Sequence, residues 1–273
     1  AVFSIPGGVL ISKIGYKKGA VVGLFMMSAA CFLFYPAAEF RVFFIFLLAM
    51  FVLAGGITIL QVAANPYVAA LGPQETASSR LNLAQAFNSL GTTIAPLISA
   101  AFILSNSVLS SDEIGALADA EKLNYYATEA SAVQGPFIIL AFVLIGLALA
   151  FAAFKLPNIL EGDEHKSGSY KVALKKKHLT FGALGIFVYV GAEVSIGSYL
   201  VNYFLSLDIA TLVANSSFMN SVANLLAVLS FSSVDVTNMN PAQLAGTFVF
   251  FYWFGAMIGR FLGSALLQKF EAG

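Results

Sequence analysis

The sequence predicts an all-α membrane protein, and three observations lead to this class. Of its 273 residues, 59% are hydrophobic and only 10% are charged, and the mean hydropathy is +0.86. Soluble globular domains carry about 25% charged residues. The charges gather in segments between apolar stretches of about the 20 residues that a helix needs to cross a bilayer. We therefore predict a multi-pass protein of the cell inner (plasma) membrane, in contact with membrane lipid.

Six apolar stretches are the predicted membrane-spanning helices. They cover residues 20–38, 42–71, 81–104, 137–154, 179–205 and 244–267. In the second, Gly55-Gly56 predicts close helix packing and Pro66 a local break. In the last, Gly255, Gly259 and Gly263 recur at four-residue spacing and predict a smooth face for helix contact. Residues 1–11 are apolar but too short to span, so we expect a fragment whose first residues end an earlier helix.

The connecting segments set the orientation through the rule that cytoplasmic loops are rich in Lys and Arg. If the basic turn at 12–19 is cytoplasmic and the sides alternate, cytoplasmic segments hold 12 of the 14 Lys and Arg residues. The stretch 209–233 is apolar enough to span, but a span there would move Arg260 and Lys269 outside. We therefore predict an external loop with an interfacial or re-entrant helix. The polar segment 105–134 is predicted as a loop, part of which could form a short surface helix.

Amide side chains follow one face of each of two consecutive spans. Gln61 and Asn65 are four residues apart, and Asn82, Gln85 and Asn88 are three apart. Polar side chains inside a membrane are costly unless they face a protein interior or a water-filled cavity. Two such faces predict one shared polar cavity, although Asn and Gln also hydrogen-bond across membrane helices without any ligand. Amides both donate and accept hydrogen bonds, which suits a ligand with many hydroxyls, such as a sugar.

Glu193 is the acidic residue that falls near the middle of a predicted span. An ionised carboxylate at mid-bilayer costs at least about 2.5 kcal/mol. A proton can keep it neutral or Na⁺ can balance it, and these are the two states that a symporter exchanges. The alternatives are a structural Glu bonded to a neighbouring helix, or one paired with a cation outside this chain.

Two long motifs carry a family resemblance. LQVAANPYVAALGP (residues 60–73) and SSRLNLAQAFNSLGTTIAP (78–96) resemble the fucose–glucose/galactose symporter family of the major facilitator superfamily. GGVLISKIGYKKG (7–19) is similar to the superfamily's basic loop motif after its second helix, with Ser12 where an acid is usual. The resemblance implies a major facilitator helical bundle and a fragment covering about helices 2–8 of 12. Residues 1–157 would be the N-terminal bundle, 158–178 the cytoplasmic linker and 179–273 the start of the C-terminal bundle.

The same resemblance implies roles for several residues. Sugar contacts of the family fall at the positions of Gln85 and Asn88. Fucose–proton symporters have a Glu where this chain has Gln61 and a Gln where it has Glu193, so the titratable role would have moved to Glu193. The QVAANPY and GAEV versions look more like the glucose/galactose branch, and family members have a short connection where this chain has residues 208–243.

These observations predict a secondary active transporter that moves a hexose with a proton or sodium ion. Its substrate-binding residues would be Gln61, Asn65, Asn82, Gln85 and Asn88, with Glu193 for coupling. The alternatives are a facilitator-type transporter for another solute, or a non-transporting membrane sensor on the same fold. Arg260 is the one candidate cation within a span and lies near its cytoplasmic end, which disfavours an anionic substrate.

Other function classes lack support in the sequence. The formal net charge is zero, so we expect no nucleic-acid partner. The single cysteine, Cys31, allows no disulfide or thiolate metal site within the chain. We find no nucleotide-binding loop, nucleophilic triad or metal-ligand spacing, and expect neither an enzyme nor a cofactor. We also expect a monomer.

Overall fold

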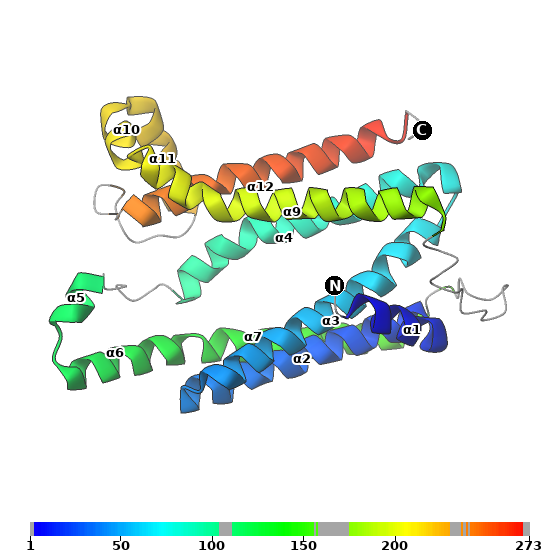
Figure 1. Cartoon of the computed structure of the whole chain (residues 1–273), viewed down its shortest axis with the longest axis horizontal. Helices are drawn as coiled ribbons and strands as arrows, with labels where there is room; N and C mark the ends of the chain where they lie inside the picture. The colour runs from blue at the N-terminus through cyan, green and yellow to red at the C-terminus, as the bar shows by residue number, and fades with distance from the viewer. Residues whose placement is uncertain are drawn as a thin grey trace. The chain divides into compact units, whose positions relative to one another are not determined.

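The computed structural model describes residues 3–103, 111–155, 157, 175–229, 236, 239 and 241–269, and within these ranges its regular secondary structure is entirely helical (Figure 1). The first helices are α1 (Ser4–Ile14), α2 (Tyr16–Phe40), α3 (Phe43–Ala70) and, after the 3-10 turn Gln74–Thr76, α4 (Ala77–Ile103). They are followed by α5 (Ser111–Ala116), α6 (Asp119–Ala132), α7 (Gln134–Ala153), α9 (Lys177–Ser206), α10 (Ile209–Asn215), α11 (Ser217–Leu229) and α12 (Pro241–Leu266). The predicted all-α class is confirmed.

Each of the six predicted spans coincides with a helix: α2, α3, α4, α7, α9 and α12. Among the described residues, five stretches are long and apolar enough to cross a membrane, namely α2, α3, the 119–153 stretch of α6 and α7, α9, and residues 244–266 of α12. α4 has the length, at 27 residues, but its first half carries amides and hydroxyls. The segment 105–134 is predicted as a loop that could include a short surface helix; the structure describes it from residue 111, and there most of it is helical, as α5 and the 14-residue α6.

The chain forms two compact units. The first comprises residues 1–77 and 106–167, and the second comprises 78–105 and 168–273. α4, which the sequence assigns to the N-terminal bundle, therefore groups here with α9 and α12. The boundary between bundles in the full-length protein remains a prediction, and residues 158–174 of the predicted linker lie outside the described ranges.

In the first unit, α2 packs against both α3 and α7. Glycines let α2 and α3 approach closely: a Cβ on Gly23 would lie 3.0 Å from the Gly56 carbonyl oxygen and 2.9 Å from the Leu60 nitrogen. The close packing predicted at Gly55-Gly56 is confirmed. α3 continues through Pro66 to Ala70, however, so the predicted break is absent. Proline removes one backbone hydrogen bond, and the rest of this long helix tolerates that loss.

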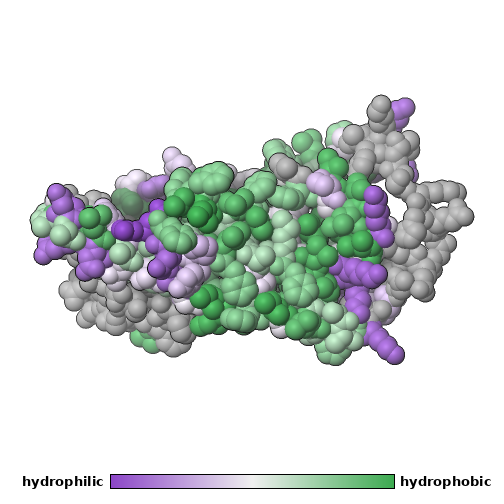
Figure 2. All heavy atoms as spheres, turned by 90° about the horizontal axis from the view of Figure 1, so that it is seen from below, coloured by the Kyte–Doolittle hydropathy of each residue, from purple (hydrophilic) through white to green (hydrophobic). Residues whose placement is uncertain are grey.

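The outward surface of the first unit is apolar. Large hydrophobic side chains of α2, α3 and α7, including Phe32, Leu47, Phe51, Phe142 and Val143, are exposed. Figure 2 shows one face of the molecule, with hydrophobic side chains over its middle and hydrophilic ones toward its two ends. This is the distribution that a bilayer core between two aqueous layers requires.

In the second unit, α12 packs against α9 and also contacts α4, α10 and α11. Residues 209–229 form two helices, α10 and α11, bent by 111°, rather than one straight span. Their buried residues Ile209, Val213, Ala223 and Ala227 form a hydrophobic core with the beginning of α12. The predicted glycine face of α12 is covered only in part: a Cβ on Gly263 would meet the Asn82 side chain, whereas one on Gly255 or Gly259 would meet no other element within 4 Å in the described residues.

Candidate transport site

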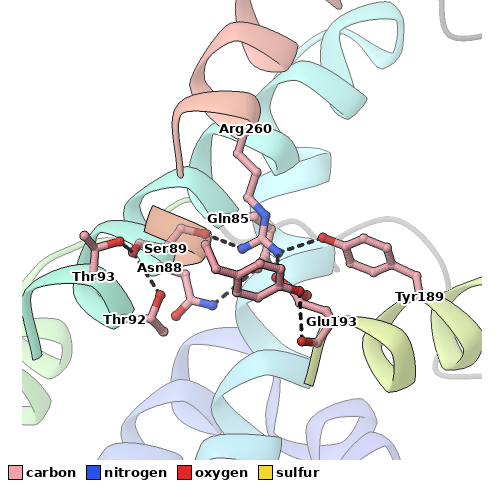
Figure 3. Close-up of polar contacts among 9 residues, drawn as sticks. Gln85, Asn88, Ser89, Thr92, Thr93, Tyr189, Glu193 and Arg260 are labelled. Carbon is pink, nitrogen blue, oxygen red and sulfur yellow. Dashed lines mark hydrogen bonds and ion pairs between the residues drawn. The ribbon is translucent and has the colours of Figure 1, made fainter. Parts of the chain in front are cut away.

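An ion pair lies between two helices of the second unit (Figure 3). Arg260 Nη2 of α12 is 2.5 Å from Glu193 Oε1 of α9, and the two side chains are only 18% and 15% exposed. The same Nη2 donates to the Tyr189 hydroxyl at 2.9 Å, while Nη1 donates to the Ser89 hydroxyl of α4. A single guanidinium therefore joins α12, α9 and α4.

The antiparallel register of α9 and α12 explains this pairing. Trp253 packs against Gly197, where a Cβ would meet the indole at 2.8 Å. Arg260 lies seven residues after Trp253. In an antiparallel pair, its neighbour on α9 lies about seven residues before Gly197, which is between Tyr189 and Glu193. Tyr189 and Glu193 are four residues apart and share one helix face, so both side chains flank the guanidinium.

The Arg260 side chain also extends along α4. Its backbone carbonyl accepts a hydrogen bond from Asn82 Nδ2 at 3.0 Å, whereas its guanidinium reaches Ser89, seven residues further along α4. Seven residues correspond to about 10 Å of helix. Long basic side chains usually extend toward the nearer membrane surface, but this one extends along α4 in the direction away from the helix start at Ala77.

The partner of Glu193 is therefore within this chain, which corrects the alternative that placed it outside. The sequence places the Cα of Arg260 near a cytoplasmic end, but it does not show how far the side chain extends from there. A membrane-embedded charge needs a partner because lipid offers no solvation. The signal in the sequence is that Arg260 is the one basic residue within a predicted span.

The amides of α4 lie beside this ion pair. Asn88 Nδ2 donates to Gln85 Oε1 at 3.5 Å, and Asn88 immediately precedes Ser89 (Figure 3). Asn88 is exposed and Gln85 is half-buried. The predicted juxtaposition on one helix face is thus present for Gln85 and Asn88, and Ser89 is a polar neighbour that the sequence prediction did not include.

Asn82 differs from the other two amides of α4. Its Nδ2 is used by the Arg260 carbonyl and lies against Gly263, where a Cβ would be 2.7 Å away. One turn earlier, Ser79 and Ser264 donate reciprocally to each other's backbone carbonyls at 2.8 and 3.0 Å. Together these side chains form a polar contact between α4 and α12, which the sequence prediction missed because single serines occur in many helices.

Gln61 and Asn65 belong to α3, in the first unit, where Gln61 is exposed and Asn65 half-buried. Their spacing on one helix face is as predicted. Their part in a shared cavity with the amides of α4 remains a prediction. Tyr252 is a further residue that the sequence did not single out: its hydroxyl donates to the Glu193 backbone carbonyl at 2.9 Å and so ties α12 to α9 without touching the carboxylate.

Long apolar helices, an ion pair between two of them and amides beside that pair define a multi-pass helical membrane protein with a polar centre. The model of the Major Facilitator Superfamily matches residues 1–273. The chain belongs to the Major Facilitator Superfamily.

Similar proteins carry sugar-transporter names. The chain is 44% identical over 276 residues to the glucose/galactose transporter of Brucella abortus biovar 1 (strain 9-941), covering 100% of this chain and 56% of the relative. It is 34% identical over 277 residues to the L-fucose-proton symporter of Escherichia coli (strain K12), covering 98% and 56%. The chain thus spans about half the length of these relatives. The predicted resemblance to this group of symporters is confirmed.

A solved structure gives the same fold. The crystal structure of FucP, a Major Facilitator Superfamily transporter in the outward conformation, aligns with a TM-score of 0.76 at 31% identity, over 98% of this chain and 60% of FucP. The predicted major facilitator bundle is confirmed by this similarity and by the family match.

Proposed function

We propose that the full-length protein containing this chain is a secondary active transporter that moves a hexose, such as glucose, galactose or fucose, together with a proton or sodium ion. The names of its relatives, a glucose/galactose transporter and an L-fucose-proton symporter, support the substrate class. The observation that carries the proposal is the Glu193–Arg260 pair with the Gln85 and Asn88 amides beside it in the same unit. Charged and amide side chains are costly inside a membrane span, so their presence there usually marks a functional site.

The sugar contacts are proposed to be amides. Gln85 and Asn88 offer carbonyl and NH₂ groups from α4, and Gln61 and Asn65 offer the same groups from α3. Substrates in this kind of transporter bind near the bilayer midplane and are exposed to alternate sides by rocking of the two bundles. We assign Asn82 to the contact between α4 and α12 instead, because its NH₂ group is used there.

The charges favour a neutral substrate. Arg260 is the residue that could recruit an anion, but Glu193 balances its charge at 2.5 Å. A sugar brings many hydroxyls and no charge, so it can bind to amides without disturbing this balance. We propose that the transported cation acts at Glu193, whose carboxylate is the acidic group of the site.

The proposal is tested with the full-length protein in proteoliposomes. Sugar counterflow reports binding and alternating access, while gradient-driven uptake also requires cation coupling. We expect Glu193→Gln to retain counterflow and to lose accumulation against a gradient. A matched control is Glu129→Gln, which removes an exposed carboxylate of α6 that bonds Tyr125 and should leave both assays unchanged. Accumulation by Glu193→Gln at the wild-type level would refute the coupling assignment.

A further inference from the structure

We propose that Arg260 is the resident counter-ion of Glu193 and competes with the transported cation for its carboxylate. With no cation bound, the guanidinium holds Glu193; a cation that binds Glu193 displaces it. Arg260 would then be a positioning residue that sets the cation concentration at which transport runs. This inference rests on the proposed function and adds to it a second residue of the coupling step.

The geometry of the pair suits displacement. The contact to the carboxylate uses one nitrogen and one oxygen, Nη2 and Oε1, whereas the tightest Arg–carboxylate pairs use two parallel hydrogen bonds. The guanidinium also donates hydrogen bonds to two hydroxyls, those of Ser89 on α4 and Tyr189 on α9. When a cation takes the carboxylate, Arg260 still has these two acceptors, so it is not left without hydrogen bonds in a low-dielectric region.

The charge balance makes the two states exclusive. Arginine stays protonated under all relevant conditions, so the pair alone is neutral, and an added proton or Na⁺ leaves a net charge of +1. A bound proton removes the negative charge that attracts the guanidinium, and a bound Na⁺ repels the guanidinium strongly where water is scarce. Cation binding therefore favours movement of the guanidinium away from Glu193, and its return favours cation release.

Ser89 is the point at which this movement would reach the sugar site. Its side chain is 1% exposed, it receives Arg260 Nη1, and it follows Asn88 directly in α4. When the guanidinium leaves Glu193, Ser89 holds it more fully. This changes the hydrogen bonding one residue away from Asn88, a proposed sugar contact. Coupling between cation and sugar would thus be carried by direct contacts across α9, α12 and α4.

The experiment measures the cation concentration that half-saturates galactose uptake into proteoliposomes. Na⁺ is varied at fixed pH, and pH is varied without Na⁺, for wild type and Arg260→Gln. An adjacent opposite charge commonly changes the ionisation of a carboxylate by about 10-fold or more. We expect Arg260→Gln to lower the half-saturating concentration of the coupled ion by about this factor while retaining counterflow. An unchanged or higher concentration would overturn the proposal.

Matched variants separate competition from packing. Arg260→Lys keeps the charge and should respond to the cation much as wild type does. Tyr252→Phe removes a bond to the Glu193 backbone but none to its carboxylate, so the half-saturating concentration should stay at the wild-type value. The backbone bond from Asn82 to residue 260 survives all three changes. A shift in Tyr252→Phe equal to that in Arg260→Gln would overturn the proposal, since a structural disturbance would then explain both.

Ser89→Ala and Tyr189→Phe provide a second route should Arg260→Gln not fold. Each removes a hydroxyl that receives the displaced guanidinium, so each should raise the half-saturating cation concentration; no change in either would reject the role of Arg260. Sugar counterflow by the wild-type protein distinguishes failure of the proposed function from failure of this inference. A wild-type protein without sugar counterflow overturns the proposed function and this inference with it, whereas normal counterflow with unaltered cation dependence overturns only the inference.

Discussion

The two units hold their helices together by different chemistry. In the first, α2 and α3 meet at Gly23 and Gly56 with almost no space between backbones, and Phe34 and Phe137 stack with ring centroids 4.1 Å apart. In the second, α4, α9 and α12 meet through hydroxyls, amides and an ion pair. Dispersion attraction falls steeply when packed surfaces separate by even a small gap, so we expect the helices of the first unit to keep one arrangement. Polar contacts can be exchanged for water, ions or ligand, so the second can change partners.

The largest expected effect of a single substitution lies in the first unit. Gly56→Leu places a side chain where even a Cβ would be 2.7 Å from Met27 Cγ and 2.9 Å from the Gly23 oxygen. Overpacking that side chains can absorb typically costs about 1–3 kcal/mol, but here the obstacles include backbone atoms of Gly23 and Met27, so the two helices would have to separate. We expect loss of folded protein, measured as the monodisperse fraction after detergent extraction. Gly146→Leu is the control, because a Cβ on Gly146 would meet no other element within 4 Å in the described residues. Equal loss of folded protein in both variants would contradict this explanation.

Next in size is the removal of one charge from the second unit. Glu193→Gln leaves Arg260 without its anion in a largely buried position, and breaking a buried pair by removing one partner costs about 3–5 kcal/mol. The double variant Glu193→Gln/Arg260→Gln leaves no unpaired charge and should be more stable than Arg260→Gln or Glu193→Gln alone. Thermal unfolding in detergent measures all four proteins. Additive losses would show that the two side chains do not interact.

A smaller effect is expected at the contact between α4 and α12. Ser79→Ala and Ser264→Ala each remove one of two reciprocal bonds between buried residues, and hydrogen bonds between membrane helices average about 0.6 kcal/mol. The losses should be modest and coupled, because each change also alters the contact between the two hydroxyls. Thermal unfolding of the single and double variants measures the coupling. Ser221→Ala, whose exposed hydroxyl donates to the Ser217 carbonyl of its own helix, should have no effect.

The same contrast explains what the sequence could predict. Spans follow from apolar stretches of sufficient length, and close packing at Gly55-Gly56 follows from the absence of side chains, so both are visible locally. The Glu193–Arg260 pair depends on the register of α9 against α12 across a sequence separation of 67 residues, and periodicity within one helix does not report that register. Pro66 shows the converse: a local rule predicted a break that the long helix α3 does not have. Asn82 and Asn88 share one predicted stripe, yet Asn82 lies against Gly263 and bonds the Arg260 carbonyl, a difference that the sequence of α4 does not reveal.

The smallest expected effect concerns α11, whose exposed face carries mostly apolar side chains with a few polar ones among them. Phe218, Leu225 and Val228 are 78%, 59% and 73% exposed, while Ser221 and Asn224 are exposed among them. Ile209–Leu229 carries no Asp, Glu, Lys or Arg, and amphipathic helices with an apolar face lie in the membrane interface. We expect these three apolar side chains to contact lipid, with little change in stability on substitution.

Spin labels test this placement in the full-length protein. A label on Phe218→Cys or Val228→Cys should collide more with oxygen, which is concentrated in lipid, than with a water-soluble nickel chelate. Cys31 is fully buried and should stay unlabelled. A preference for the nickel chelate at both sites would place α11 in water, and the bent pair α10–α11 would then be an external cap on α12 and not a membrane-interface element.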